Sequence, residues 1–331
     1  MEHWLGAVLL AAFKSASVIL VLLLIAAYMV LAERKLLARL QVRYGPNRAG
    51  PGGILQPLAD MIKLFTKEDT APERADKVIF FLAPALVAST VLMSFAVVPW
   101  GPEFSIGGTR VQGVVADLPV GVLYLFAMSS LAVYGVVLGG WASNSKYSLL
   151  GGIRGAAQMI SYELSLGLSL APVVMLCGSF SLVTIVEAQE KIPFALVQPF
   201  SLVIFLLSSM AETRRIPFDL PEAENELVAG YHTEYSGMRF GLFFLGEYVN
   251  VLVLGALVAT MFLGGWKGPF LPPALWFLLK VLAVAFLLIW IRGTLPRLRY
   301  DQLMHLGWKF LLPASILNVL GTGAVLVLLE V

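Results

Sequence analysis

Long apolar stretches alternate with polar segments along the whole chain. Eight of these stretches are long enough to cross about 30 Å of hydrocarbon, which takes roughly 20 helical residues. They lie near residues 10–32, 78–99, 117–140, 156–178, 194–213, 240–263, 274–292 and 310–329. The pattern therefore predicts eight transmembrane helices.

The first polar segment, residues 33–77, carries a helical pattern of its own. After the turn-rich sequence YGPNRAGPGG at 44–53, apolar residues recur at helical spacing, and Gln56, Asp60 and Lys63 occupy the other side. The apolar positions are Ile54, Leu55, Leu58, Met61, Ile62 and Phe65. Such a helix is too short to span and is expected to lie in the interface. It either anchors the segment to the membrane surface or lines an opening through which an amphiphile enters.

A basic stripe precedes this amphipathic helix. In the sequence ERKLLARLQVR (33–43), helical geometry places Lys35, Arg39 and Arg43 on one face. Contact with anionic lipid headgroups explains such a stripe. A docking surface for a cytoplasmic partner is the alternative.

Composition assigns the chain to the membrane proteins. Of 331 residues, 59% are hydrophobic and only 13% are charged, and the mean hydropathy is +0.84, which excludes a soluble globular domain. We expect an all-α polytopic membrane protein with a single membrane domain over residues 1–331. Residues 1–13 contain Glu2 and no Lys or Arg, so the first apolar stretch is expected to be a retained span rather than a signal peptide.

The net charge and the number of cysteines exclude further classes of function for this chain. A net charge of +2 gives no indication of nucleic-acid binding. The single cysteine, Cys177, lies in an apolar run and is expected to be a small buried hydrophobe. Because a four-thiolate iron–sulfur cluster needs four cysteines, any redox centre must belong to a partner. We expect no catalytic residue, metal or flavin in this chain.

The basic residues predict the orientation of the spans. With their flanks, the loops after odd-numbered spans hold eighteen Lys and Arg residues, whereas those after even-numbered spans hold three. Basic residues gather on the cytoplasmic side, so the odd-numbered loops are expected to face the cytoplasm and both termini the opposite side. Lys14 and Lys280 lie inside predicted spans. Both can snorkel to the surface, and Lys280 alternatively continues a proton relay toward another subunit.

Three acidic residues lie in the cytoplasmic half of predicted spans. Counted along the helical rise, Glu163 is roughly 12 Å and Glu247 roughly 10 Å below the cytoplasmic surface, and Glu212 ends the fifth span. A charge at such depth costs a few kcal/mol, which makes it a functional hypothesis. A structural hydrogen bond or a lysine partner explains any one of them. Together they are expected to form a chain that exchanges protons near neutral pH.

The loop 212–239 is acidic on the face where loops are usually basic. Its carboxylates are Glu212, Asp219, Glu222, Glu224, Glu226 and Glu234, and its arginines are Arg214, Arg215 and Arg239. We interpret this loop as the acidic end of a proton-coupling path.

Part of this acidic charge has a structural explanation. Asp219 and Glu222 have capping-box spacing, which predicts a helix over 222–229 with Pro221 in its first turn. Glu222 and Glu224 then lie at the positive end of the helix dipole. The carboxylates left unexplained are Glu212, Glu226 and Glu234.

Long motifs in three segments are similar to those of a known family. They are ERKLLARLQVRYGPNRAGPGGILQPLADMIKLFTKED (33–69), SNSKYSLLGGIRGAAQMISYE (143–163) and AETRRIPFDLPEAENELVAGYHTEYSGM (211–238). On these motifs the chain resembles the H-type membrane subunit of NADH:quinone oxidoreductase, the respiratory complex I, which is the counterpart of the first mitochondrially encoded subunit. The likeness runs from about Glu33 to Tyr300, and the terminal spans match only in hydrophobicity.

The resemblance implies a place within a proton-translocating complex that is active only when assembled. In this family, cytoplasmic subunits carry the terminal iron–sulfur cluster and the quinone headgroup site. The H-type subunit supplies the tunnel for the quinone tail, between the first span, the interfacial helix and the sixth span. Spans two to six are expected to resemble half of an antiporter subunit. Further implied partners are antiporter-like and small membrane subunits and the lipid bilayer.

The resemblance also implies roles for single residues. Those that would line the quinone tunnel or its neck are Glu33, Arg34, Arg43, Asp60 and Lys63. Those that would form an acidic funnel beneath the headgroup are Glu212, Glu224, Glu226 and Glu234. Those that would transmit the state of the quinone headgroup toward the antiporter-like subunits are Tyr162, Glu163 and Glu247. The implied cofactor is quinone, in a bacterial inner membrane with both termini periplasmic, or alternatively in the mitochondrial inner membrane.

Other functions stay open at this point. The membrane anchor of an energy-converting hydrogenase or formate hydrogenlyase is homologous but uses no quinone, and the intact first loop favours the quinone enzyme. A stand-alone proton or cation transporter usually has Gly- or Pro-broken helices in paired repeats, which we do not find in the sequence. In a passive structural anchor, Glu163→Gln and Glu247→Gln should leave quinone reductase activity intact, whereas we expect substantial loss of coupled activity.

Overall fold

The computed structural model describes residues 2–106, 109–222 and 224–329. Its helices and strands are α1 (Glu2–Leu40), α2 (Gln56–Thr66), α3 (Lys77–Ser94), β1 (Gly101–Ile106), β2 (Thr109–Gly113), α4 (Gly121–Ala142), α5 (Lys146–Cys177), α6 (Leu182–Ala188), α7 (Phe194–Val197), α8 (Pro199–Glu212), α9 (Glu224–Leu227), α10 (Gly237–Phe262), α11 (Pro273–Thr294), α12 (Tyr300–Leu306) and α13 (Leu312–Leu328). Short helical turns lie at Pro51–Gly53, Phe95–Val97, Gly230–His232 and Gly307–Leu311. The chain is therefore mostly helical, as its composition predicts.

Within the described residues, seven helices are long and apolar enough to cross a membrane. They are Val8–Leu40, Lys77–Val97, Gly121–Ala142, Lys146–Cys177, Gly237–Phe262, Pro273–Thr294 and Tyr300–Leu328. The structure thus agrees with a polytopic membrane protein, but it does not confirm the predicted count of eight transmembrane helices, because the apolar helix Pro199–Glu212 is shorter than the other seven.

The predicted span 194–213 is a broken helix, formed by α7 and α8. The break falls at Gln198, whose ψ is 56°, because the ring of Pro199 disfavours a helical conformation in the residue before it. α8 has 14 residues, or about 21 Å at the helical rise, which is less than the hydrocarbon thickness.

Two helices extend beyond the predicted spans. α1 continues to Leu40 instead of ending near residue 32, and α5 begins at Lys146 instead of near residue 156. Hydrophobicity predicts only the apolar part of a helix, whereas its hydrogen-bond ladder continues through polar residues of good helix propensity. Glu163 consequently lies near the middle of α5, and the start of α5 does not mark the membrane surface.

A short hairpin in the connection between α3 and α4 departs from the predicted all-α fold. Its strands β1 and β2 are antiparallel, with Phe104 opposite Val111. A hairpin is permitted here because its open edges lie between spans, where they can bind water, and not inside a span. Lys14 of α1 donates hydrogen bonds to the carbonyl oxygens of Gln112 and Val114, at 3.0 and 3.3 Å. These bonds fasten the hairpin to α1.

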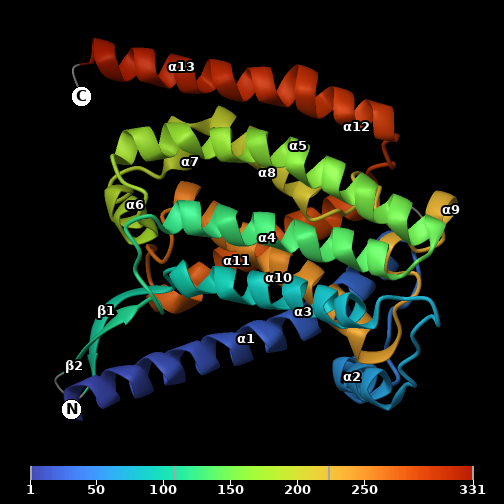
Figure 1. Ribbon diagram of the computed structural model, residues 1–331. Coiled ribbons are helices and arrows are strands. Elements are labelled where there is room, and N and C mark those ends of the chain that lie inside the picture. The colour runs from blue at the N-terminus through green and yellow to red at the C-terminus, as the bar shows by residue number, and fades with distance from the viewer. Residues whose placement is uncertain (1, 107–108, 223, 330–331) are drawn as a thin grey trace.

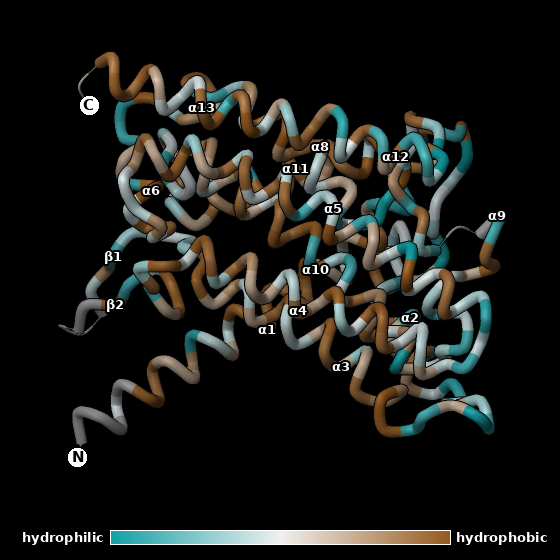
Figure 2. The backbone as a smooth tube through the Cα atoms, turned by 45° about the horizontal axis from the view of Figure 1, so that its top comes forward, coloured by the Kyte–Doolittle hydropathy of each residue, from teal (hydrophilic) through white to brown (hydrophobic). Residues whose placement is uncertain are grey.

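The long helices lie side by side, with α1 along one edge of the bundle, α13 along the other, and α10 and α11 between them (Figure 1). The described ends of the chain, the hairpin and α6 lie at one end of the bundle, and α2, α9 and α12 lie at the opposite end. Figure 2 shows that the connections near α2 and α9 are rich in hydrophilic residues. The predicted cytoplasmic loops 33–77 and 212–239 therefore come together at one end.

α10 is the most buried of the long helices. Every residue from 251 to 262 is buried, and apart from Thr260 this half of the helix is apolar on every face, as expected of a helix enclosed by others. Glycines let its neighbours approach closely. A Cβ on Gly246 would lie 2.7 Å from the Val87 side chain of α3, and one on Gly255 would lie 3.0 Å from the Val281 carbonyl oxygen of α11. α10 thus carries its side chains into the interior of the bundle.

Candidate functional site

Charged side chains from three helices and one loop meet in this interior. Arg215, in the loop after α8, donates to Glu33 Oε2 at 2.9 Å and to Glu247 Oε1 at 2.8 Å. Arg292 of α11 also donates to Glu33. The guanidinium carbon of Arg215 lies 4.4 Å from the ring centre of Tyr248. We call Glu33, Arg215, Glu247 and Arg292 the arginine cluster.

The arginine cluster balances its charges away from solvent. The side chain of Arg215 is 3% exposed, that of Glu33 4% and that of Glu247 11%. A buried ion costs several kcal/mol unless a partner and hydrogen bonds compensate it, and here two carboxylates face two guanidinium groups. Burial acts to lower the pKa of Arg215, but Glu247 and Glu33 outweigh it, so the pKa is raised above its usual value. The cluster joins α1, α10 and α11.

A buried glutamine directs the loop after α8 toward this cluster. Gln158 of α5 donates to the carbonyl oxygens of Ala211 and Phe218, each at 2.6 Å. These bonds hold both ends of the segment between them against α5. Arg214 and Arg215 lie inside that segment, and both side chains are buried.

A second pair of carboxylates binds hydroxyl groups. Ser129 and Ser130 are adjacent on α4, and they donate to Glu212 of α8 and to Glu163 of α5, respectively. We call these four residues the serine cluster. A hydroxyl can donate to a carboxylate or accept from a carboxylic acid. The serine cluster can therefore gain or release a proton and keep its hydrogen bonds.

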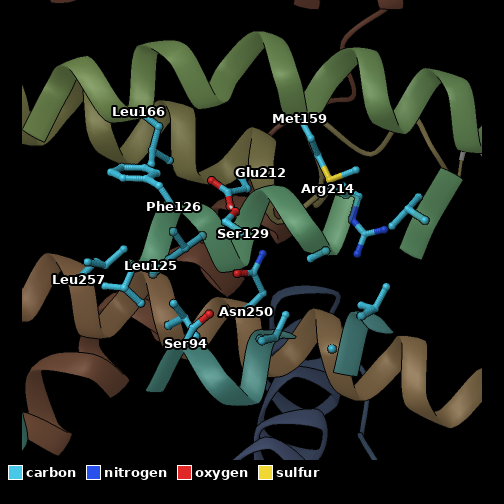
Figure 3. A pocket seen from close by; sticks show the side chains of 17 residues that line it. Ser94, Leu125, Phe126, Ser129, Met159, Leu166, Glu212, Arg214, Asn250 and Leu257 are labelled. Carbon is cyan, nitrogen blue, oxygen red and sulfur yellow. The ribbon is translucent and has the colours of Figure 1, made fainter. Parts of the chain in front are cut away.

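A cavity of about 40 Å³ adjoins the serine cluster (Figure 3). Ser129 and Glu212 line it together with Arg214 and with Asn250 of α10, and most of the remaining wall is apolar. A cavity of this volume with several polar groups can hold an ordered water molecule. Arg214, the neighbour of Arg215 in the chain, thus shares the wall of this cavity with the serine cluster.

The loop between α8 and α10 carries a further acid, Glu222. Glu222 Oε1 lies 3.6 Å from His232 Nε2. Burial, with the nearby Glu247 and Asp219, raises the pKa of Glu222 to about 8. Burial and the positive charge of Arg214 lower the pKa of His232 to about 4. Near pH 7 both side chains are mostly uncharged.

This geometry corrects the predicted capping box. α9 begins after Glu222 and has four residues, so the predicted helix over 222–229 is only partly formed. The left-handed backbone of Val228, with φ of 68°, follows directly and ends it. The predicted capping box is therefore not formed, and the Glu222 side chain approaches His232.

The predicted tunnel residues at the end of α1 point in different directions. Successive helical residues are rotated by about 100°, and Glu33, Arg34 and Lys35 show this. Glu33 enters the arginine cluster, Arg34 pairs with Asp60 of α2 at 2.8 Å, and Lys35 donates to the carbonyl oxygen of Gly52. The Arg34–Asp60 pair joins α1 to α2.

The structure places Arg43 and Lys63 apart from this pair. Arg43 lies beyond the end of α1, with its Nε 2.8 Å from the side chain of Gln41. It therefore does not extend the predicted stripe of Lys35 and Arg39. Lys63 is exposed on α2. The apolar side chains of α2 are exposed as well, and the position of this helix in the membrane interface stays a prediction.

The residues of the predicted acidic funnel also lie in different places. Glu212 is buried in the serine cluster, whereas Glu226 is half exposed and pairs with Arg154 at 2.5 Å. Glu234 is half-buried and belongs to neither cluster. Glu224 begins α9, and its side chain lies outside the described residues.

The predicted chain of three membrane acids is likewise split between the clusters. Glu163 and Glu212 meet on the serines of α4, and Glu247 binds Arg215. Tyr162, also predicted in this path, donates to the carbonyl oxygen of Leu303 at 2.7 Å. That bond holds α12 against α5.

Lys280 has a structural partner at the end of a helix. Its ammonium group donates to three carbonyl oxygens at 2.7 to 2.9 Å, those of Leu263, Gly265 and Lys267. These carbonyl groups belong to Leu263, the C-cap residue of α10, and to the turn that follows it, so Lys280 holds the C-terminal end of α10 in place.

Sequence reasoning missed the arginines that hold the site together. It counted Arg214, Arg215 and Arg292 only toward charge balance and orientation, and it gave His232 no role. The available signal was the Arg-Arg pair directly after an apolar helix. Arginines at membrane depth almost always find partners in the protein interior.

Similarity to known proteins covers nearly the whole chain. Residues 13–323 match the NADH dehydrogenase family. The chain is 66% identical over 324 residues to the second H-type subunit of NADH-quinone oxidoreductase from Syntrophobacter fumaroxidans, with 98% of each chain covered. It is 63% identical over 315 residues to the first H-type subunit of the same enzyme from Geobacter metallireducens, with 95% of this chain and 96% of the relative covered. The resemblance inferred from the three motifs is confirmed, and the chain belongs to the family of H-type subunits of NADH-quinone oxidoreductase.

Proposed function

We propose that this chain is a membrane subunit of a proton-translocating NADH:quinone oxidoreductase in a bacterial inner membrane. It forms part of the access path for the quinone tail and the first part of the path that couples quinone reduction to proton movement. The observation that carries this proposal is the buried Arg215, which binds Glu33 and Glu247 at once. With one cysteine, the chain cannot hold a four-thiolate cluster, so it responds to electron transfer in its partners through charge.

The access path runs between α1, α2 and α10. Asp60 is held from two sides, by Arg34 at 2.8 Å and by Gln56 Nε2 at 3.1 Å. Beside it, Leu58 and Ile62 expose an apolar face on α2. A molecule with a long apolar tail can follow this face out of the bilayer and meet polar groups at the α1–α2 junction.

The coupling of quinone reduction to proton movement begins at the arginine cluster. A negative charge formed on the quinone attracts Arg215 or Arg292, and at 4 Å this attraction is worth about 4 kcal/mol at an effective dielectric constant of 20. That is comparable to the several kcal/mol of a buried ion's desolvation. A guanidinium that shifts leaves Glu247 uncompensated, and a buried carboxylate without a partner takes up a proton.

The proton then reaches the serine cluster through the cavity. Asn250, Arg214 and Glu212 all line the cavity. An ordered water there bridges these groups, and the hydroxyl of Ser129 holds Glu212 in either protonation state. Glu163, bound to the next serine of α4, continues the path.

The variant Glu212→Gln tests the coupling path, because it keeps a hydrogen bond to Ser129 and cannot release a proton. In the assembled complex in vesicles, proton pumping and quinone reduction should fall by about a hundredfold, the lower end of what a positioned proton-transfer group contributes. NADH oxidation by a water-soluble artificial acceptor should be unchanged. Normal pumping by the assembled variant would contradict the proposal.

The variant Asp60→Ala tests the access path. It should raise the KM for a long-tailed quinone more than the KM for a short-tailed one, because only the long tail needs the apolar route along α2. An equal change for both quinones would argue against this route.

Quinone reductase subunits that co-purify with the tagged chain support the assignment, whereas a nickel–iron partner would indicate a hydrogenase anchor. The chain reconstituted alone should move no protons, and proton movement by it would indicate a transporter.

A further inference from the structure

Another face of α1 borders an open groove shared with α11, with a volume of about 800 Å³. Residues 24–39 of α1 form one wall and residues 282–289 of α11 form the other, and the loop 44–52 closes one end. The lining residues include two cations, Lys35 and Arg39, and no carboxylate. We call this feature the α1–α11 groove. It lies on a different side of α1 from the Arg34–Asp60 junction.

The length of the groove corresponds to one leaflet of a bilayer. Lys35 and Leu24 are eleven residues apart on α1, or about 17 Å at the helical rise. Half of the hydrocarbon core measures about 15 Å. With the cations at the level of the headgroups, the apolar walls extend to the middle of the membrane.

The loop 44–53 holds Lys35 at the mouth of the groove. It packs closely on α1, since a Cβ on Gly45 would lie 3.1 Å from the Cα of Lys35. The carbonyl oxygen of Gly52 accepts a hydrogen bond from the Lys35 ammonium group, which has two further donors. Among the ion pairs of the described residues, none includes Lys35 or Arg39. Two cations without a carboxylate partner therefore stand at the polar end of an apolar groove.

We propose that the α1–α11 groove binds one anionic phospholipid. Its phosphate lies at Lys35 and Arg39, and an acyl chain lies against Leu282 and Phe286 of α11. Cations near the membrane surface attract anionic headgroups, and apolar walls suit an acyl chain. An oxidised quinone that enters from the bilayer meets only the second requirement, because its headgroup is uncharged. This proposal is independent of the quinone path, which uses α2.

Photoreactive phospholipids test the proposal on the assembled complex in bilayer nanodiscs. Phosphatidylglycerol and phosphatidylcholine probes carry the same photoreactive acyl chain, and the labelled peptides are identified by mass spectrometry. The phosphatidylglycerol probe should label peptides of α1 and α11 roughly thirtyfold more, because each of two surface cations contributes about fivefold. Equal labelling by the two probes would overturn the proposal. Loss of labelling in excess inorganic phosphate would also overturn it, since it would indicate a free-anion site.

Two variants separate the headgroup contacts from the groove itself. Lys35→Gln with Arg39→Gln should reduce phosphatidylglycerol labelling to the phosphatidylcholine level. Leu282→Trp keeps both cations, places a bulky ring where the acyl chain is proposed to lie, and should also strongly reduce labelling. The matched control is Arg48→Gln, since Arg48 is an exposed cation of the same loop that does not line the groove, and its labelling should not change.

Labelling that persists in both variants would contradict the site. A crosslink from position 39 to an acidic segment of a partner subunit, in place of lipid, would also contradict it. If the double variant does not assemble, Leu282→Trp and the comparison of the two headgroups in the unaltered complex decide the question.

Discussion

The arginine cluster and the serine cluster bury carboxylates in different ways. In the arginine cluster, Glu33 and Glu247 share a guanidinium group, which is always charged and can only donate hydrogen bonds. In the serine cluster, Glu163 and Glu212 bind hydroxyl groups, which donate or accept. The first arrangement depends on charge balance and responds to a new charge. The second tolerates a change of protonation. The same substitution should therefore have different consequences in the two clusters.

Arg215→Ala should have the largest effect, because it leaves Glu33 and Glu247 buried without their shared partner. Breaking a buried ion pair in this way costs about 3–5 kcal/mol. The amount of assembled complex in native gels of solubilised membranes should therefore fall below about a tenth of normal. An unchanged amount would show that the two carboxylates do not need Arg215 for charge balance.

Glu163→Gln and Glu247→Gln compare the clusters directly. Glu163→Gln should leave the amount of assembled complex unchanged and reduce proton pumping by about a hundredfold, because the amide replaces a group that can release a proton. Glu247→Gln should reduce both, because it also leaves Arg215 short of one negative partner. The measurements are native gels and pumping in reconstituted vesicles. If both variants assembled equally well, the proposed difference between the clusters would be wrong.

The stability of the loop between α8 and α10 should depend on pH through Glu222 and His232. When the loop opens, the pKa of Glu222 returns from about 8 to 4.5 and that of His232 from about 4 to 6.5. Between pH 6.5 and 8, the closed loop holds one proton more than the open loop, so its stability falls as the pH rises. Between pH 4.5 and 6.5 the two contributions oppose each other and nearly cancel.

Hydrogen exchange of the loop amides measures this dependence. After correction for the intrinsic rate, exchange should increase by up to about tenfold per pH unit between pH 6.5 and 8. Glu222→Gln should remove the increase, and His232→Gln should retain it. The same slope in Glu222→Gln as in the unaltered complex would exclude Glu222 as its source.

Arg154→Gln should have the smallest effect. Its pair with Glu226 is partly exposed, with side chains 31% and 51% accessible, and such pairs contribute about 0.2–1 kcal/mol. The amount of assembled complex and the quinone reductase rate should change by less than about twofold. A large loss of activity would group Glu226 with the buried acids and weaken the distinction between buried and exposed carboxylates.

The sequence by itself determined the class of the protein, its family and most of its helices. Burial of apolar side chains in a membrane depends on long runs of neighbouring residues, so hydrophobicity reveals the spans without knowledge of the fold. For the same reason Glu163 and Glu247 stood out, since an acid within an apolar run is visible locally. The break at Pro199 was also a local signal, although it was not used.

Only the tertiary structure decided which partner each acid has. Glu247 binds an arginine 32 residues away, and Glu33 binds arginines 182 and 259 residues away. Capping-box spacing suggested a local role for Glu222, but the folded loop directs it to His232. The strength of a buried ion pair depends on distance and on the exclusion of water. Both are properties of the packed helices, and spacing along the chain does not contain them.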